Sequence, residues 1–157
     1  MALPVRWGPN RELGPDGMVL GGLSMSVGDL DRSIAFYAAL GFEMSEAFQI
    51  LPAYAPMLEQ AAEFTARAIY MRRDGIPIEL VQMVSAPATA PPSAGLGRQL
   101  GLAHIRIGTD DLARAEALVK AHGGSVLDDL RTTANGMTYV YATDPDGMRI
   151  LLSAPAG

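Results

Sequence analysis

The sequence predicts an α+β fold in which two paired βαβββ modules form curved mixed sheets that enclose a cavity, with the helices on the outer face. The first observation behind this prediction is an internal repeat, since residues 21–42 align with residues 103–124 without a gap. The second is that each copy passes from strand periodicity to helix periodicity at an aspartate. The third is that each copy ends in two strands joined by an Asp-Gly turn.

The first copy opens with GLSMSV, in which apolar residues alternate with small or polar ones, as is typical of a strand with one buried face. Asp29 fits a helix N-cap, because its carboxylate can accept the free backbone N–H groups of the first turn. Leu30, Ile34 and Tyr37 then follow at helical spacing, and Gly41 fits the position after the helix, where a positive φ is needed. We therefore expect a strand, a helix and a defined helix end.

The second copy has the same order of features. The stretch AHIRIG alternates in the manner of a strand, and Asp111 stands at the expected N-cap. Leu112, Ala115 and Val119 form the apolar stripe of the helix, which ends at Gly123. Two more strands follow in each copy, RAIYMRR and IPIELVQM in the first, MTYVYAT and MRILLSA in the second.

Proline and glycine content suggests how the modules are bounded. Residues 1–17 are expected to form an extended N-terminal arm, and residues 18–85 the first βαβββ module. A Pro/Ala-rich stretch over residues 86–97 is expected to be a linker, and residues 98–157 the second module. Together the two modules make one domain.

Composition excludes several classes of function. The chain has 157 residues, no cysteine and a formal net charge of −5. The lack of cysteine excludes disulfides, thiolate catalysis and cysteine-type zinc sites. Without a run of Lys or Arg we expect no nucleic-acid partner, and without a long apolar stretch we expect no membrane partner. The start has no apolar core of the signal-peptide kind, so a cytoplasmic location is the simplest expectation.

The motifs of the two copies resemble those of the vicinal oxygen chelate (VOC) superfamily. The first copy has V-x-D-L-x-x-S-x-x-F-Y-x-x-L-G-F from Val27 to Phe42, and the second has H-I-x-I-x-x-D-D-L from His104 and the turn D-P-D-G from Asp144. The superfamily includes glyoxalases, methylmalonyl-CoA epimerases, extradiol dioxygenases and bleomycin-binding proteins. The resemblance covers residues 18–154 and implies the fold, a small-molecule ligand and a homodimer.

In metal-dependent relatives, the first and last strands of each copy supply ligands. The resemblance places these positions at Gly22, Glu79, His104 and Leu151, of which only Glu79 and His104 can bind a metal. The second histidine, His122, falls at a helix end, where the helix dipole favours a cation and a surface position is expected. We therefore predict no metal and no other cofactor. A divalent metal held by His104 and Glu79 is the alternative.

Without a metal, Glu79 and His104 are predicted to form a carboxylate–imidazole pair, because the resemblance implies that they share one site. Such a carboxylate fixes the imidazole tautomer and raises its basicity, which suits a general base next to a carbonyl. The alternative is that Glu79 and His104 form hydrogen bonds that satisfy their polar groups but have no part in catalysis.

Strand alternation adds further candidates for ligand binding. Polar residues on the strand faces of Gly22 and His104 are Ser24, Ser26 and Arg106. Met83, Tyr139 and Leu151 lie on the paired strands. Phe48 and Tyr54 lie in a stretch that only the first copy has, and this stretch is expected to close over the cavity. Such a lining favours a hydrophobic ligand, aromatic or apolar, with a few carbonyl or hydroxyl groups.

Three functions follow from these residues. We favour a metal-independent enzyme of the isomerase, epimerase, cyclase or lyase type, with His104 and Glu79 as its catalytic groups. The first alternative is a non-catalytic protein that binds or sequesters a small molecule, as the bleomycin-resistance branch does. The second is a metal-dependent VOC lyase or isomerase with substituted ligands.

Overall fold

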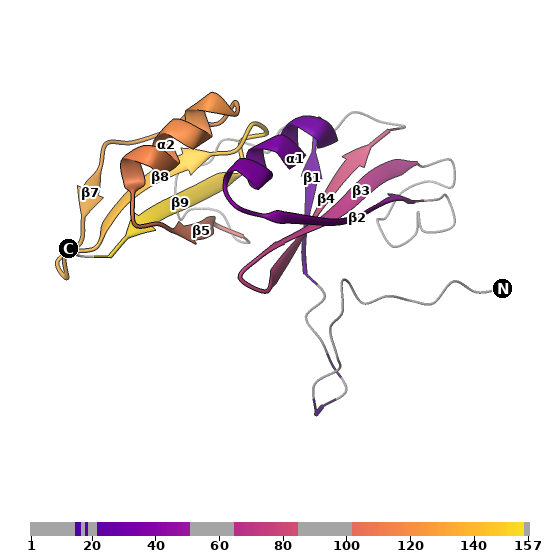
Figure 1. Cartoon of the computed structure of the whole chain (residues 1–157), viewed down its shortest axis with the longest axis horizontal. Helices are drawn as coiled ribbons and strands as arrows, with labels where there is room; N and C mark the ends of the chain where they lie inside the picture. Colours follow the sequence, from indigo (N-terminus) through magenta and orange to yellow (C-terminus); the bar gives the residue numbers. More distant parts are fainter. Residues whose placement is uncertain (1–14, 17, 19–21, 51–64, 85–101, 156–157) are drawn as a thin grey trace. The chain divides into compact units, whose positions relative to one another are not determined.

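The computed structural model describes residues 15–16, 18, 22–50, 65–84 and 102–155. The chain divides into two compact units, Met1–Ala88 and Thr89–Gly157. Each unit has one sheet with one helix packed on it (Figure 1). The predicted linker and residue Tyr54 lie outside the described residues, as does nearly all of the predicted arm.

The first unit has a four-stranded mixed sheet in the order β1-β4-β3-β2. β1 (Leu23–Val27) runs parallel to β4 (Ile76–Met83), and β3 (Ala66–Arg73) runs antiparallel to β4 and to β2 (Glu43–Ile50). The parallel pair requires a crossover, which the helix supplies, whereas the antiparallel pairs need only short turns.

The turn between β3 and β4 shows why the sequence has Asp-Gly there. Asp74 and Gly75 both have positive φ, 52° and 77°, as the central residues of a type I′ hairpin turn must. A two-residue turn of this type fixes the register, and Arg73 accordingly pairs with Ile76 at the start of the ladder. The register of the whole hairpin therefore follows from the position of this dipeptide.

Helix α1 (Leu30–Ala39) begins and ends as predicted. The Asp29 carboxylate accepts a hydrogen bond from the Arg32 backbone N–H at 2.9 Å, and Gly41 after the helix has a φ of 83°. Phe36 and Tyr37 are fully buried and their rings meet edge to face, with centroids 5.2 Å apart. The helix thus fixes the buried face of the first sheet.

The second unit repeats the arrangement with a five-stranded sheet. β5 (Ile105–Gly108) runs parallel to β9 (Arg149–Ala154), and β8 (Thr138–Thr143) runs antiparallel to β9. Two short strands, β6 (Ser125–Val126) and β7 (Arg131–Thr132), both pair with β8. The βαβββ pattern predicts one strand between the helix and the last two strands, and two short strands take its place in this copy.

Local contacts account for the split strand. After β6 the backbone still pairs once, because the Leu127 N–H donates to the Tyr141 carbonyl at 2.8 Å. The chain then leaves the sheet through Asp128, whose carboxylate lies 3.2 Å from the Arg131 guanidinium at the start of β7. The ion pair spans the interruption.

Helix α2 (Leu112–Ala121) also has the predicted ends. The Asp111 carboxylate accepts from the Arg114 N–H at 2.9 Å, and Gly123 has a φ of 86°. His122 is the C-cap, and its Nδ1 lies 3.0 Å from the Leu118 carbonyl oxygen, a contact of the helix end. Among the described residues, no helix is long and apolar enough to cross a membrane.

Asp144 organises the turn before β9. Its side chain is buried, and one carboxylate oxygen accepts hydrogen bonds from the backbone N–H groups of Asp146 at 2.9 Å and Met148 at 2.8 Å. We expect Asp144→Ala to lower the free energy of unfolding by about 1–3 kcal/mol, because both N–H groups lose their partner in a partly buried turn. Urea denaturation measures this change. Asp129→Ala, at an exposed position of the same unit, is the control and is expected to change stability by less than about 0.5 kcal/mol.

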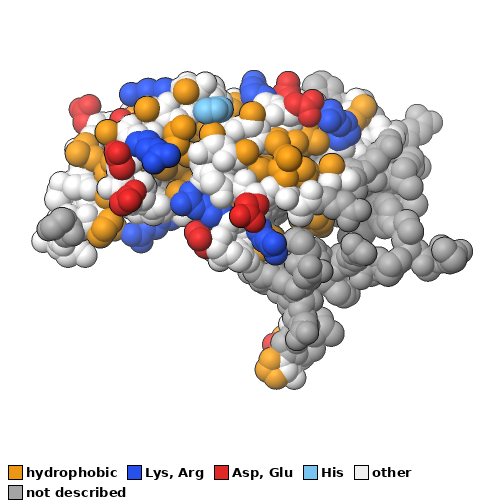
Figure 2. Space-filling model, viewed as in Figure 1, with side chains coloured by type: hydrophobic (Ala, Val, Ile, Leu, Met, Phe, Trp, Pro, Cys, Tyr) orange, Lys and Arg blue, Asp and Glu red, His pale blue; other side chains and the backbone are white. Residues whose placement is uncertain are grey.

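These elements confirm the predicted α+β class, with two βαβββ repeats and a mixed sheet in each. Figure 2 shows acidic and basic side chains interspersed on the visible face of the described residues. What matters for function is the face of each sheet that the helix leaves free.

Candidate functional site

The free face of the first sheet is polar where β1 and β4 meet. Met25 and Val27 of β1 are buried, whereas Ser24 and Ser26 alternate with them and are exposed. On β4, Leu80 is buried and Glu79 beside it is half-buried. Alternation therefore places Ser24, Ser26 and Glu79 on the free face, as the sequence predicted.

The strands on either side of β4 each bring one hydroxyl group to the Glu79 carboxylate. Glu79 stands opposite Ser24 of β1 on one side and opposite Tyr70 of β3 on the other. The Ser24 hydroxyl donates a hydrogen bond to Glu79 Oε2, and the Tyr70 side chain is also hydrogen-bonded to Glu79. We call Ser24, Tyr70 and Glu79 the hydroxyl–carboxylate cluster. It holds one carboxylate in a defined position on the sheet.

Sequence reasoning missed Tyr70, although the sequence contains the means to find it. Counting outward from the two-residue turn at Asp74-Gly75 pairs Tyr70 with Glu79, as the observed register does. Once the turn was predicted, the partner of Glu79 could have been read from this count.

Burial and the charge of Glu79 raise the pKa of the Tyr70 hydroxyl above its ordinary value of 10.0. Burial is the larger cause, followed by the negative charge of Glu79 and the hydrogen bond to it. Tyr70 therefore keeps its proton at physiological pH and remains a hydrogen-bond donor to the carboxylate.

This shift gives a pH prediction. Because the folded pKa lies above the unfolded one, the contribution of Tyr70 to stability is complete below pH 10.0 and is lost as pH rises through the folded value. Phenolate absorbance is measured as pH rises, for the wild type and for Tyr70→Phe. The difference between the two curves should show one tyrosine that ionises above the ordinary pKa of 10.0. Glu79→Gln should move that ionisation to lower pH, whereas an unchanged curve would contradict the contact.

Of the remaining predicted residues of the first unit, the structure describes the side chain of Met83 but not those of Phe48 and Tyr54. Met83 is half-buried on the same face of β4 as Glu79, four residues further along the strand. The backbone of Phe48 in β2 pairs with Ala68 of β3, but its side chain lies outside what the structure describes. Their part in ligand binding stays a prediction, as does that of Tyr54.

The free face of the second sheet is aromatic. The His104 and Tyr141 rings meet edge to face with centroids 5.8 Å apart, and the Tyr141 and Tyr139 rings do so at 5.9 Å. Leu151 of β9 lies between Arg106 and Tyr141 in the ladder and is 9% exposed. The structure thus brings four predicted residues of this unit onto one face: His104, Arg106, Tyr139 and Leu151.

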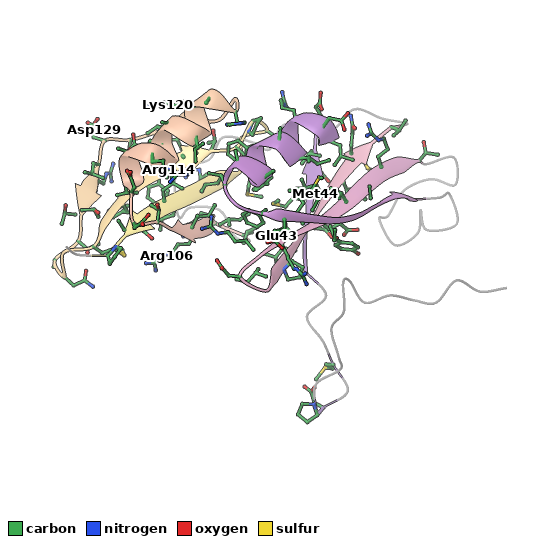
Figure 3. The ribbon with its side chains drawn as sticks, in the orientation of Figure 1. Glu43, Met44, Arg106, Arg114, Lys120 and Asp129 are labelled. Carbon is green, nitrogen blue, oxygen red and sulfur yellow. The ribbon has the colours of Figure 1, made fainter. Side chains whose placement is uncertain are left out.

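Arg106 is held on this face by two uncharged groups. Its Nε donates to Ser153 Oγ at 3.1 Å, and its Nη2 donates to Met137 Sδ at 3.0 Å. Arg106 lies on the side of the sheet away from α2, which bears Arg114 and Lys120 (Figure 3). The guanidinium is therefore fixed in place without a carboxylate partner among the described residues.

Glu79 and His104 belong to different units, so their predicted pairing stays a prediction. Within its own unit Glu79 has hydroxyl partners, and within its own unit His104 has a ring contact with Tyr141. Each group is therefore oriented by neighbours on its own sheet.

Of the four positions that the resemblance assigns to metal ligands, each unit has only one that can donate, Glu79 in the first and His104 in the second. Within each, the described residues contain no group of three or more His, Asp or Glu side chains that could hold a metal ion. Gly22 packs against β4: a Cβ built there would lie 3.2 Å from the Pro77 carbonyl oxygen and 3.3 Å from its Cγ. Leu151 is apolar and buried. The residues present therefore fit a zinc or iron site poorly.

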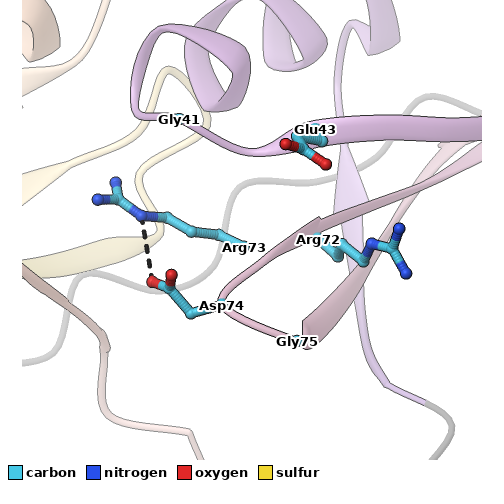
Figure 4. A pocket seen from close by; sticks show the side chains of 6 residues that line it. All are labelled: Gly41, Glu43, Arg72, Arg73, Asp74 and Gly75. Carbon is cyan, nitrogen blue, oxygen red and sulfur yellow. Dashed lines mark ion pairs between the residues drawn. The ribbon is translucent and has the colours of Figure 1, made fainter.

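A hollow of about 350 Å³ lies elsewhere in the first unit, beside the turn of the β3–β4 hairpin (Figure 4). Within it the Arg73 guanidinium donates to the Leu40 carbonyl at the end of α1 and lies 3.4 Å from the Asp74 carboxylate. These contacts stabilise a helix end, where a cation is favoured. The hollow is lined by Gly41, Glu43, Arg72, Arg73, Asp74 and Gly75. The sequence predicted none of these residues as part of the functional site.

Known structures share this fold. A glyoxalase family protein from Bacillus cereus is 18% identical, with a TM-score of 0.75 over 87% of this chain and 93% of that one. A glyoxalase family protein from Enterococcus faecalis is 19% identical, with a TM-score of 0.60 over 84% of this chain and 94% of that one. Glyoxalase I from Zea mays is 22% identical, with a TM-score of 0.59 over 85% of this chain but 43% of the maize chain.

No curated protein matches the sequence closely enough to count as a relative. The family model described as the Glyoxalase/Bleomycin resistance protein/Dioxygenase superfamily matches residues 19–152, which is most of the chain. The sequence motifs, the two βαβββ repeats and this match all indicate the same family. The chain belongs to the Glyoxalase/Bleomycin resistance protein/Dioxygenase superfamily.

Proposed function

We propose that this protein is an acid–base enzyme of the isomerase or lyase type that acts on a small apolar or aromatic carbonyl compound without a metal. One observation supports the proposal above all others. A carboxylate, Glu79, stands half-buried on the free face of its sheet with the hydroxyls of Ser24 and Tyr70 hydrogen-bonded to it. Groups held in this way are suited to proton transfer, because little reorganisation is needed when a substrate binds.

The proposed step is proton abstraction from a carbon next to a carbonyl. The C–H bond breaks, the proton passes to a Glu79 oxygen, and the electron pair forms an enolate on the substrate. Return of the proton to another carbon gives an isomerase, and loss of a leaving group from the enolate gives a lyase. His104 is the second proposed proton carrier, with its ring orientation set by Tyr141.

A second candidate is binding without chemistry, in the manner of a sequestering protein. The aromatic face of the second unit favours it, since Tyr139, Tyr141 and Leu151 together suit an apolar ligand. The metal-dependent alternative is the weakest of the three, because two of the four positions that the resemblance assigns to metal ligands, Gly22 and Leu151, have no donor side chain. The homodimer and the cytoplasmic location stay predictions.

The proposal is tested by proton exchange in D2O. Wild-type protein is incubated with aromatic ketones and diketones, starting from benzoylacetone, and proton NMR follows loss of the C–H signal next to the carbonyl. We expect exchange above the buffer rate with at least one compound. His104→Ala should slow it by about 10²-fold or more, whereas His122→Ala is the matched control and should not. Tight binding without any exchange would favour the binding candidate instead.

A further inference from the structure

The free face of the second unit bears a positive charge that no described carboxylate neutralises. Arg106 is exposed, and the two groups that accept its hydrogen bonds are a hydroxyl and a thioether. By comparison, the Arg131 guanidinium of the same unit lies 3.2 Å from the Asp128 carboxylate. A guanidinium that is fixed on a sheet face, with no carboxylate partner in the described part of the chain, is a place for an anion to bind.

There is room beside this guanidinium. Gly108 lies two residues further along β5, on the same face as Arg106 and opposite Ser153. A Cβ built on Gly108 would find no atom within 4 Å. Its φ is not positive, so backbone conformation does not require a glycine there. The lack of a side chain leaves open space next to Arg106.

An aromatic and apolar surface adjoins that space. Ser153, which accepts from Arg106, pairs with Tyr139 of β8, and Leu151 pairs with both Arg106 and Tyr141. The Tyr139 and Tyr141 rings are nearly perpendicular, at 86°. A flat ring that packs edge to face on one tyrosine can therefore hold its substituent near the guanidinium.

We propose that this face binds a small planar aromatic carboxylate, with the carboxylate on Arg106 and the ring against Tyr139 and Tyr141. A guanidinium presents N–H donors in a planar fork, which matches a carboxylate better than a single carbonyl oxygen. The inference rests on the proposed function in one respect, that this face takes the reacting molecule. It narrows the proposed substrates, small apolar or aromatic carbonyl compounds, to those that also have a planar aromatic ring with a carboxylate.

A binding experiment tests the inference without turnover. Naphthoate is compared with naphthamide, which has the same ring and shape but no charge, by calorimetry and by proton NMR of the tyrosine rings. We expect naphthoate to bind at least about tenfold more tightly, since hydrogen bonds to charged groups contribute more than neutral ones. The Tyr139 and Tyr141 ring signals should shift on binding. Equal affinities, or no binding of naphthoate up to its solubility, would overturn the proposal.

Variants locate the site. Arg106→Gln should abolish the preference for naphthoate, Arg106→Lys should keep part of it, and Gly108→Leu should weaken both ligands by filling the space. Arg114→Gln, on α2, is the matched control and should leave the preference intact. Circular dichroism confirms that each variant is folded. A preference that survives Arg106→Gln, or affinities that Gly108→Leu leaves unchanged, would contradict the inference. Since proton exchange is measured separately, either result would leave the proposed function standing.

Discussion

Replacing Glu79 by glutamine should lower the rate of proton exchange about 10²- to 10⁴-fold, because an amide of the same size cannot accept the proton. The amide can still accept a hydrogen bond through its oxygen from Ser24 or Tyr70, so the local structure should persist. Binding of a neutral ketone should change much less than the rate. The measurement is the exchange rate in D2O at saturating ketone, together with the ketone dissociation constant.

Glu43→Gln is the matched control for this prediction, since Glu43 is an exposed carboxylate on β2 of the same sheet. It should leave the exchange rate unchanged. Ser24→Ala and Tyr70→Phe each remove one hydroxyl from the carboxylate and should lower the rate by less than Glu79→Gln does. If Glu79→Gln kept the wild-type rate, Glu79 would not be the proton acceptor, and its bonds to Ser24 and Tyr70 would be structural.

The largest effect on stability is expected from Phe36→Ala. Phe36 is fully buried at the centre of α1, with its ring 5.2 Å from the Tyr37 ring. Truncation removes the buried ring and leaves a space that the helix and sheet can only partly close, so we expect a loss of about 3–5 kcal/mol. Denaturation by urea, followed by circular dichroism, measures the loss.

Met44→Ala is the control for the core. Met44 lies on β2 of the same unit and is 61% exposed, so truncation should cost less than about 0.5 kcal/mol. A loss of less than about 1 kcal/mol for Phe36→Ala would contradict the packing described for α1.

Most of the fold could be predicted because short-range rules decide it. Asp29 and Asp111 accept N–H groups at the helix starts, Gly41 and Gly123 have positive φ at the ends, and Asp74-Gly75 forms the hairpin turn. Each of these features depends on residues within one turn of the chain. The split between β6 and β7 was not predicted, because it depends on how the chain around Asp128 meets β8.

For the candidate site, the sequence could predict which sheet face each side chain lies on, but not which side chains contact one another. Strand alternation predicted that Ser24 and Ser26 share one face and that His104 and Arg106 share another, because this periodicity is local. That Glu79 lies on the face of Ser24 came from the family resemblance, and the register agrees with it. Contacts between side chains on neighbouring strands could not be predicted from alternation alone. The bond of Tyr70 to Glu79 depends on register, and those of Arg106 to Ser153 and Met137 depend on side-chain rotamers as well.

The central claim is that side chains alone move the proton, and metal analysis combined with proton exchange tests it most directly. Purified protein is assayed by elemental analysis and by exchange in D2O, before and after treatment with a chelator. We predict far less than about one metal equivalent per chain and an exchange rate that the chelator leaves unchanged. About one tightly held equivalent, with exchange lost on chelation and restored when the metal is returned, would contradict the account.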